Sequence, residues 1–324
     1  MRVDGVFVAV TPETFPETIV VLRALGLGDL LTGIPALRGL RRAHPDAHIV
    51  LAAPERYRDL VMLIGLVDEL HPTPGLGRLR PRRHPPALAV NLHGSGPESI
   101  ADLLAMGPRT LISHRHPAYP GVDGPPWRTE LHEVDRWCAL LEWAGITCDS
   151  ENLAIPRPDG YRNRSSTVVI HPGAAYAARR WPAERFGQVA AALRNRGHDV
   201  VITGDDSEVD LARSVADAAG LPRSSVLAGT LGLLELVTLI HDCRLLICGD
   251  TGVGHIATAT GTPSVLLFGP TPPNRWGPRG TGPHIAVWAG DKGDPHADRP
   301  HRGLLLITVG RVLDATESLL KDCA

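Results

Sequence analysis

Residues 244–270 read RLLICGDTGVGHIATATGTPSVLLFGP, and their pattern decides the fold. Two short apolar runs, RLLIC and PSVLLFG, are separated by a glycine-containing turn and by a helical segment that begins at Gly252. Continuous apolar strands that alternate with helices are typical of a parallel sheet covered on both faces. The stretch therefore predicts one strand–helix–strand unit of a doubly wound α/β domain.

The same alternation runs through both halves of the chain. Further strands are predicted at residues 18–24, 48–53, 87–92, 167–173 and 199–204, and helices at 30–43, 55–64, 98–106, 131–144, 183–196, 207–219, 231–241 and 308–321. A polar stretch, residues 145–166, interrupts the pattern and contains Pro156, Pro158 and Gly160. Polar segments rich in proline and glycine mark domain boundaries. We therefore expect two Rossmann-like domains with doubly wound parallel sheets, residues 1–155 and 160–324, which face each other across a cleft.

Length and composition limit the classes of protein that this chain can belong to. Its 324 residues suit two domains, and a net charge of −2 gives no overall positive field for nucleic acid. No apolar run reaches the ~18 residues of a membrane span, and the first 17 residues lack the long apolar region of a secretion signal. Five scattered cysteines without a CxxC pair predict reduced thiols in a cytoplasm and argue against a structural zinc site.

The turn after the first predicted strand contains two glycines and an aspartate. Gly26 and Gly28 allow close backbone approach, and Asp29 lies at or near the N-cap of the next helix. Aspartate is a favoured N-cap, and a carboxylate at a strand end is also well placed to take a proton from a hydroxyl group. Both roles remain open. A dinucleotide fingerprint starting at Gly26 would require glycine at the position of Leu31, so that interpretation is disfavoured.

Two arginines occupy the corresponding turn of the second half. Arg179 and Arg180 follow Gly173 and come just before Trp181-Pro182, where a helix is predicted to start. Two guanidinium groups at such a turn can bind a diphosphate through charge-assisted hydrogen bonds. A solvated pair of charges is the alternative, but the flanking glycine and the Trp-Pro pair favour phosphate.

The segment CGDTGVGH predicts an anion site at a helix start. Asp250 and Thr251 can cap the helix, and Gly252 and Gly254 leave backbone N–H groups unobstructed. The N-terminus of a helix attracts anions through such N–H groups and through its partial positive charge. No G-K-[ST] follows, so the segment is not a P-loop. His255 either contacts a phosphate or is an ordinary core histidine.

Acidic residues open the helix that follows residues 199–204. Asp205, Asp206 and Glu208 complement the helix dipole in one interpretation. In the other, one carboxylate accepts hydrogen bonds from both hydroxyls of a ribose, as acidic residues do in nucleotide-binding folds.

Four stretches together resemble the heptosyltransferases of glycosyltransferase family 9, which have a GT-B fold of two Rossmann-like domains. These stretches are residues 20–47, 171–186, 200–208 and 247–271. The resemblance implies inverting transfer of a heptose, or a related sugar, from an ADP-activated donor to an acceptor hydroxyl. It assigns Asp29 as the general base.

The resemblance also implies the donor contacts. They are Gly28, Arg179, Arg180, Glu208 for the ribose, and Asp250, Thr251, Gly252, Gly254 and His255 around the diphosphate and sugar. No cofactor and no obligatory metal are expected. The sequence departs from the family at Ala174 and Ala175, where some members carry hydroxyl groups. Loops 72–86 and 114–129 are the least similar part, so the resemblance does not fix lipopolysaccharide core as the acceptor.

Partners and competing functions follow from this assignment. The expected partners are a nucleotide-sugar donor and a glycan or small-molecule acceptor, with no nucleic acid, and with peripheral membrane contact if the acceptor is a glycolipid. The competing functions are a GT-B-type nucleotide-sugar epimerase and a non-catalytic nucleotide-sugar-binding module. Envelope glycans and glycosylated natural products remain equally open as products.

Overall fold

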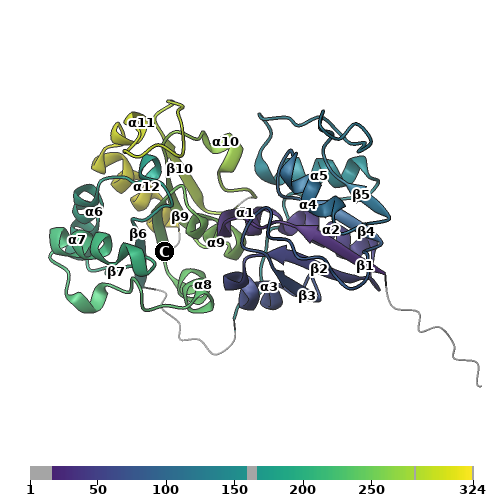
Figure 1. The fold of residues 1–324 in the computed structure, drawn as a ribbon. Coiled ribbons are helices and arrows are strands. Elements are labelled where there is room, and N and C mark those ends of the chain that lie inside the picture. Colours follow the sequence, from purple (N-terminus) through teal and green to yellow (C-terminus); the bar gives the residue numbers. More distant parts are fainter. Residues whose placement is uncertain (1–16, 159–165, 281, 323–324) are drawn as a thin grey trace, which may run out of the picture.

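The computed structural model describes residues 17–158, 166–280 and 282–322. Two α/β halves lie side by side, each built around its own sheet (Figure 1). The N-terminal segment, for which the sequence predicts no secretion signal, and Cys323 lie outside the described residues. No helix in the described part is long and apolar enough to cross a membrane.

The first half contains a five-stranded parallel sheet in the order β3-β2-β1-β4-β5. Its strands are β1 (Thr18–Leu22), β2 (His48–Ala53), β3 (Glu69–Pro72), β4 (Leu88–Asn91) and β5 (Thr110–Ile112). Strand order reverses between β1 and β4. In open α/β sheets, ligands bind beyond the carboxyl ends of the strands at such a reversal. The turn that contains Asp29 directly follows β1 and so lies at this position.

The second half also contains a five-stranded parallel sheet, but with a different strand order, β10-β9-β8-β6-β7, in which its first strand, β6, lies between its second and third strands. Its strands are β6 (Thr167–His171), β7 (Asp199–Ile202), β8 (Leu245–Gly249), β9 (Ser264–Phe268) and β10 (His284–Trp288). Here the order reverses between β6 and β8. The turns after these two strands contain the predicted arginine pair and the predicted anion site. The expected fold class, two Rossmann-like parallel-sheet units, is therefore confirmed.

Helices cover the sheets in both halves (Figure 1). They are α1 (Leu27–Thr32), α2 (Ile34–Ala43), α3 (Arg58–Ile64), α4 (Glu98–Leu104), α5 (Glu133–Trp143), α6 (Ala183–Asn195), α7 (Val209–Ala219), α8 (Leu233–Asp242), α9 (Gly252–Thr260), α10 (Pro273–Trp276), α11 (Arg302–Leu305) and α12 (Val309–Asp322). The longer predicted helices are all present, with shifted ends. One prediction is wrong in detail, because residues 30–43 do not form a single helix.

The predicted helix breaks at Gly33, between α1 and α2. Pro35 lies in the first turn of α2, where its missing N–H is tolerated. Without that N–H it could not donate the hydrogen bond that would continue α1 as one regular helix. A Cβ atom on Gly33 would lie only 3.0 Å from Cδ of Arg23. Glycine at the break therefore lets a buried arginine pass beside the helix junction.

Three strands, β3, β5 and β10, were not predicted. Each forms an outer edge of its sheet, and each is mostly half-buried or exposed. Such strands lack the continuous apolar run that identifies a central parallel strand, and β5 has only three residues. The missed strands are therefore those whose position depends on packing and on pairing with a neighbouring strand, and not on a local apolar run.

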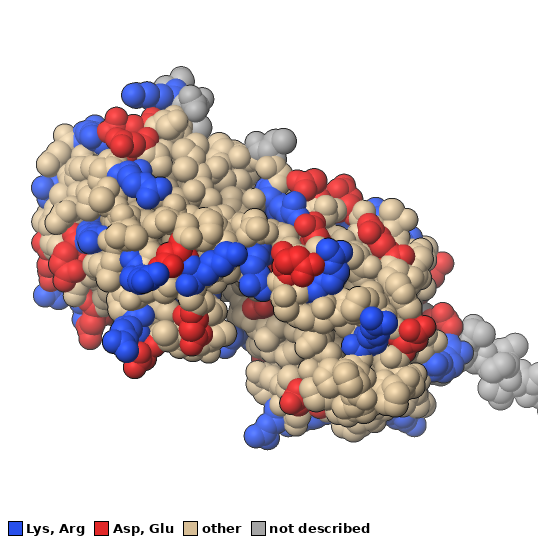
Figure 2. All heavy atoms as spheres, turned by 90° about the horizontal axis from the view of Figure 1, so that it is seen from above, with Lys and Arg blue, Asp and Glu red and all other residues tan. Residues whose placement is uncertain are grey.

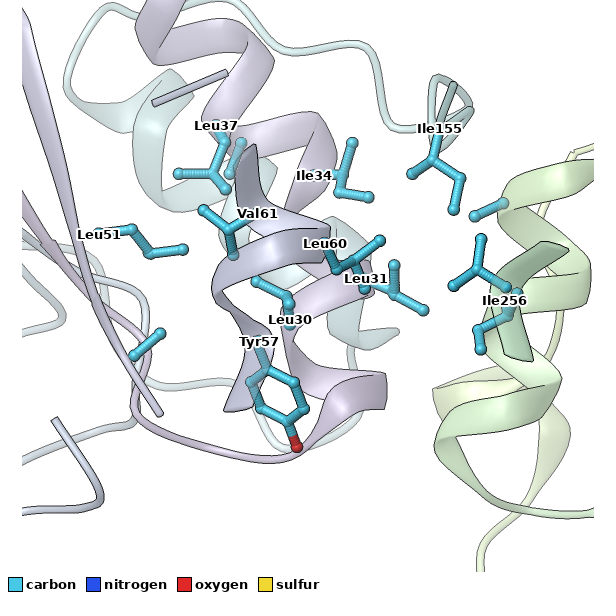
Figure 3. Packing of buried hydrophobic residues seen from close by; sticks show 14 of the residues in the cluster. Leu30, Leu31, Ile34, Leu37, Leu51, Tyr57, Leu60, Val61, Ile155 and Ile256 are labelled. Carbon is cyan, nitrogen blue, oxygen red and sulfur yellow. The ribbon is translucent and has the colours of Figure 1, made fainter. Parts of the chain in front are cut away.

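The largest apolar cluster extends across both halves. Figure 3 shows Leu31 and Ile34 near α9, with Ile256 opposite them and Ile155 close by. Leu31, Ile34 and Ile256 are fully buried, and the backbone N–H of Ile155 donates to Ala259 O at 3.0 Å. The helix that carries Asp29 is thus packed against the helix that begins at Gly252. The domain limits at residues 155 and 160 remain a prediction.

Candidate active site

Asp29 lies in the first turn of α1, directly beyond β1. Gly26 occupies the N-cap, and Asp29 occupies the third helical position. Since Gly26 has no side chain, the Asp29 carboxylate itself caps the helix: its Oδ2 accepts a hydrogen bond from the Gly26 N–H at 3.2 Å. Asp29 therefore does cap the helix, but from the third helical position rather than as the N-cap residue, and it uses only one carboxylate oxygen.

The other oxygen, Oδ1, lies 3.9 Å from Nη2 of Arg23. This separation is longer than a hydrogen bond, and a quarter of the Asp29 side chain is exposed. Burial raises the pKa of Asp29 above its usual value; Arg23 opposes this increase and the negative charge of Glu133 adds to it. A raised pKa makes a carboxylate a better proton acceptor. The capping and base roles can therefore coexist, one on each oxygen.

Glycines bring the starts of α1 and α9 into contact. A Cβ on Gly28 would lie 2.8 Å from the His255 ring, and a Cβ on Gly252 would lie 2.8 Å from Cβ of Leu27 and 3.1 Å from the backbone N of Gly28. Any larger residue would push the two helices apart. The first-half turn and the D-T-G turn, widely separated in sequence, are therefore neighbours.

Arg179 and Asp250 meet at the carboxyl end of the second sheet. Arg179 ends a short 3₁₀ helix, Ala177–Arg179, and its Nη1 donates to the backbone O of Asp250 at 3.4 Å. Its buried Nε has no hydrogen-bond partner among the described residues. Burial raises the pKa of Asp250 to about 6; Arg179 opposes this, and the charge of Asp29 adds to it. Carboxylates from opposite halves therefore influence each other.

The raised pKa of Asp250 predicts a pH-dependent effect of Asp250→Asn. Because the folded-state pKa, about 6, exceeds the ordinary value of 3.8, Asp250 contributes its full stability below ~3.8 and loses it as the pH rises through ~6. Asparagine cannot ionise. The free energy of unfolding of the variant relative to wild type should therefore increase by about 2 kcal/mol between about pH 4 and pH 8.

Urea denaturation across this pH range measures the difference. Asp217→Asn, at an exposed position on α7, controls for the exchange of a carboxylate for an amide. A constant difference between Asp250→Asn and wild type would contradict the prediction.

The start of α9 lines a small cavity. Thr251 is the N-cap, and Thr251 and Gly252 are partly exposed. The N–H of Gly254 instead donates to Thr251 O at 3.0 Å, so the expectation that this N–H is unobstructed is wrong. A Cβ on Gly254 would lie 3.0 Å from Leu266, which shows that this glycine allows α9 to pack against β9.

The cavity has a volume of only about 10 Å³, and its lining includes Asp250, Thr251, His255 and Trp276. This is far below the range of ~300–1,000 Å³ that is usual for ligand pockets, so the cavity by itself is too small to hold a ligand of that class. Figure 2 looks down on this boundary and shows a hollow there, with basic and acidic side chains around it. The rings of His255 and Trp276 form a T-shaped pair. Burial lowers the pKa of His255 to about 4. His255 is therefore a buried, neutral histidine beside this cavity, which agrees with the core interpretation, and its contact with a phosphate stays a prediction.

Glu208 lies in a notch between two glycines at the ends of β6 and β7. A Cβ on Gly173 would lie 2.0 Å from Oε1 of Glu208, and a Cβ on Gly204 would lie 2.9 Å from its Cβ. Oε2 accepts a hydrogen bond from the Asp205 N–H at 3.1 Å, and burial raises the pKa of the carboxyl. Glu208 thus both caps the 3₁₀ turn Asp206–Glu208 and places a buried carboxylate at the carboxyl ends of β6 and β7, whereas Asp205 and Asp206 are exposed.

The two adjacent arginines have different surroundings. Arg180 Nε donates to Ala174 O at 2.8 Å, and its charge opposes the rise in the pKa of Glu208. Arg179 instead faces the turn at Asp250. The structure therefore separates the predicted pair, placing Arg180 toward the candidate ribose carboxylate and Arg179 toward the candidate diphosphate site.

Sequence reasoning missed the charged groups around Asp29. Arg23 is 1% exposed and Glu133 is 8% exposed. His132, the N-cap of α5, forms a hydrogen bond across the halves from Nε2 to Gly277 O at 3.0 Å. A charged residue that directly follows the apolar run TIVVL was the one sequence signal for Arg23. Within the described ranges, no three His, Cys, Asp or Glu side chains are grouped so that they could hold a metal ion.

Two Rossmann-like halves whose strand ends meet in this way define the GT-B fold. The chain belongs to glycosyltransferase family 9, the heptosyltransferases, whose model matches residues 128–298. Lipopolysaccharide heptosyltransferase 3 of Escherichia coli K12 is 27% identical over 335 residues, covering 92% of this chain and 96% of the relative. Lipopolysaccharide heptosyltransferase 2 of the same strain is 26% identical and covers 93% and 98%.

Solved structures share the fold. A family 9 glycosyltransferase from Veillonella parvula DSM 2008 has a TM-score of 0.80 at 24% identity, covering 94% of this chain and 98% of its own. The ADP-heptose lipopolysaccharide heptosyltransferase II of E. coli has a TM-score of 0.75 at 23% identity, covering 95% and 100%. The GT-B fold and the glycosyltransferase class are thereby confirmed, and the epimerase and binding-module alternatives are not favoured.

Proposed function

We propose that the protein transfers a heptose, or a closely related sugar, from an ADP-sugar to an acceptor hydroxyl with inversion. The observation that carries the proposal is the contact between the two glycine turns: Asp29 of the first half lies beside the start of α9 in the second. The curated relatives are named as lipopolysaccharide heptosyltransferases, which supports heptose as the sugar.

The second half would bind the donor. Glu208 would accept hydrogen bonds from the ribose hydroxyls, because its carboxylate lies at the carboxyl ends of β6 and β7. The diphosphate would lie between Arg179 and the first turn of α9. The Nε of Arg179, which lacks a hydrogen-bond partner among the described residues, supports this placement, as do the partly exposed Thr251 and Gly252.

The first half would present the acceptor. Oδ1 of Asp29 takes the proton from the acceptor hydroxyl while the hydroxyl oxygen bonds to the anomeric carbon. The bond from that carbon to the diphosphate breaks, and its electron pair leaves with ADP. Arg179 and the N–H groups at the start of α9 stabilise the developing negative charge, so no metal is required. A single displacement with one base gives inversion.

The acceptor is a glycan or small molecule on the side of loops 72–86 and 114–129. A glycolipid acceptor would bring the protein to a membrane surface without a spanning helix. The free thiols of Cys138, Cys148, Cys243 and Cys248 support a reducing compartment, and we place the enzyme in the cytoplasm.

A nucleotide panel tests the donor assignment directly. ADP should raise the thermal midpoint of unfolding more than UDP, GDP or TDP at equal concentration. At 100 times its dissociation constant a ligand stabilises the fold by about 2.7 kcal/mol. Glu208→Gln should reduce the increase produced by ADP. Equal shifts for all four diphosphates, or a largest shift with another base, would contradict an ADP-sugar donor.

A further inference from the structure

Arg23 is a fully buried arginine between the proposed base and the rest of the first half. It directly follows β1, and its side chain forms four hydrogen bonds. Nε donates to the backbone O of Asp29, and Nη1 donates to Leu92 O beyond β4. Nη2 donates to Oγ1 of Thr32 at 3.0 Å. One side chain therefore links β1, α1 and the end of β4.

Glu133 completes this arrangement from α5. Its Oε1 accepts from Nη2 of Arg23 at 3.3 Å and from Nε1 of Trp137 at 2.8 Å, and its Oε2 accepts from Nε of Arg136 at 3.2 Å. The guanidinium of Arg23 also lies 4.9 Å from the centre of the Trp137 ring. Since a buried charge is costly without partners, two guanidinium groups and an indole keep Glu133 ionised and hold it in place.

The helix that carries Asp29 needs such support. α1 has six residues, and a helix this short is not stable by itself. The backbone O of Asp29 accepts from Arg23 Nε, from the Gly33 N–H at 3.2 Å and from Thr32 Oγ1 at 3.0 Å. Arg23 therefore fixes the backbone of Asp29, whereas its 3.9 Å distance from Oδ1 leaves that oxygen accessible to a hydroxyl group.

We propose that Arg23 and Glu133 are positioning residues for the base: Arg23 fixes the first turn of α1, and Glu133 fixes Arg23. The inference rests on the proposed role of Asp29. Neither residue touches the reacting atoms; they act through the position and the charge environment of the Asp29 carboxylate. Displacement of a catalytic group by about 1 Å can cost about 10²-fold in rate.

The charges that face Asp29 predict opposite effects for the two residues. Nη2 of Arg23 lies 3.9 Å from Oδ1 of Asp29 and 3.3 Å from Oε1 of Glu133. The charges of Glu133 and, from the second half, Asp250 also act on Asp29. His255 of α9 packs against Gly28, but its low pKa keeps it neutral. Loss of the Arg23 cation should raise the pKa of Asp29, and loss of the Glu133 anion should lower it.

The test uses Arg23→Met and Glu133→Gln in the full chain. The NMR resonance of the Asp29 carboxyl carbon, assigned by its absence in Asp29→Asn, is titrated in the free protein without any acceptor. Its midpoint should move to higher pH in Arg23→Met and to lower pH in Glu133→Gln. The acid limb of kcat against pH should move in the same two directions, and kcat should fall by about 10²-fold in Arg23→Met. KM for the ADP-sugar should remain unchanged.

Arg136→Met is the matched control, because Arg136 also binds Glu133, whereas its other hydrogen bonds go to Arg128 O and Leu131 O, outside α1. It should lower the melting temperature without moving the acid limb as far as Arg23→Met does. If Arg23→Met does not fold, the expected downward shift of the Asp29 midpoint in Glu133→Gln tests the inference by itself. If Asp29→Asn is inactive but the Asp29 midpoints of the two variants shift in the same direction, or do not shift, the positioning role is wrong and the proposed base still stands. Normal turnover by Asp29→Asn would overturn the proposed base itself.

Discussion

Asp29→Asn is expected to lower kcat by roughly 10²–10⁴-fold, the range typical of the loss of a general base. Asparagine has nearly the same shape as aspartate, and its amide oxygen can still accept the hydrogen bond from the Gly26 N–H. Helix α1 should therefore keep its cap while the residue loses its ability to take a proton. ADP release in the presence of donor and acceptor measures kcat, and calorimetric titration with ADP measures donor binding, which should remain unchanged.

Asp68→Asn provides the matched control for this variant. Asp68 also accepts a backbone hydrogen bond, from the Ile49 N–H at 2.8 Å. It precedes β3, however, and so lies at the amino ends of the strands, whereas Asp29 lies at their carboxyl ends. Its replacement should leave kcat within a few-fold of wild type. Near-normal turnover by a folded Asp29→Asn would rule out Asp29 as the base. Unimpaired release of an altered sugar without acceptor would instead indicate epimerisation.

Arg179→Ala is expected to weaken ADP binding by about 10–100-fold. The reason is the loss of charge-assisted hydrogen bonds to the diphosphate, which are worth about 1.5–3 kcal/mol each. The Nη1 of Arg179 donates to Asp250 O at 3.4 Å, and its Nε has no partner among the described residues, so this cation lies at the start of α9. Isothermal titration with ADP and with adenosine separates the two parts of the ligand: ADP should lose affinity, and adenosine should not.

Arg213→Ala removes an equal charge from an exposed position on α7 and serves as the control. Its affinity for ADP should match that of wild type. If Arg179→Ala weakened ADP and adenosine equally, Arg179 would support the shape of the site rather than bind the diphosphate. If neither changed, the assignment of Arg179 would be wrong.

The central architecture could be predicted because buried parallel strands appear in the sequence as continuous apolar runs. Runs such as TIVVL at Thr18–Leu22 and LLICG at Leu245–Gly249 are almost wholly buried, as their composition predicts. Parallel strands place the turns that follow them at one edge of the sheet, so Asp29, Glu208 and Asp250 could be selected as site residues before their surroundings were known. The edge strand Thr110–Ile112 carries no such signal.

By itself, the sequence determined the alternation of strands and helices and the turns in which functional side chains had to lie, because apolar periodicity and glycine positions are local properties. Only the tertiary structure decided which groups surround those side chains. Arg23 and Glu133 are 110 residues apart in sequence and meet because β1 and α5 belong to one core. Gly254 became a packing residue because β9 lies against α9. The pKa of Asp250 reached about 6 through burial, a property that exists only once distant segments exclude water from the carboxyl group.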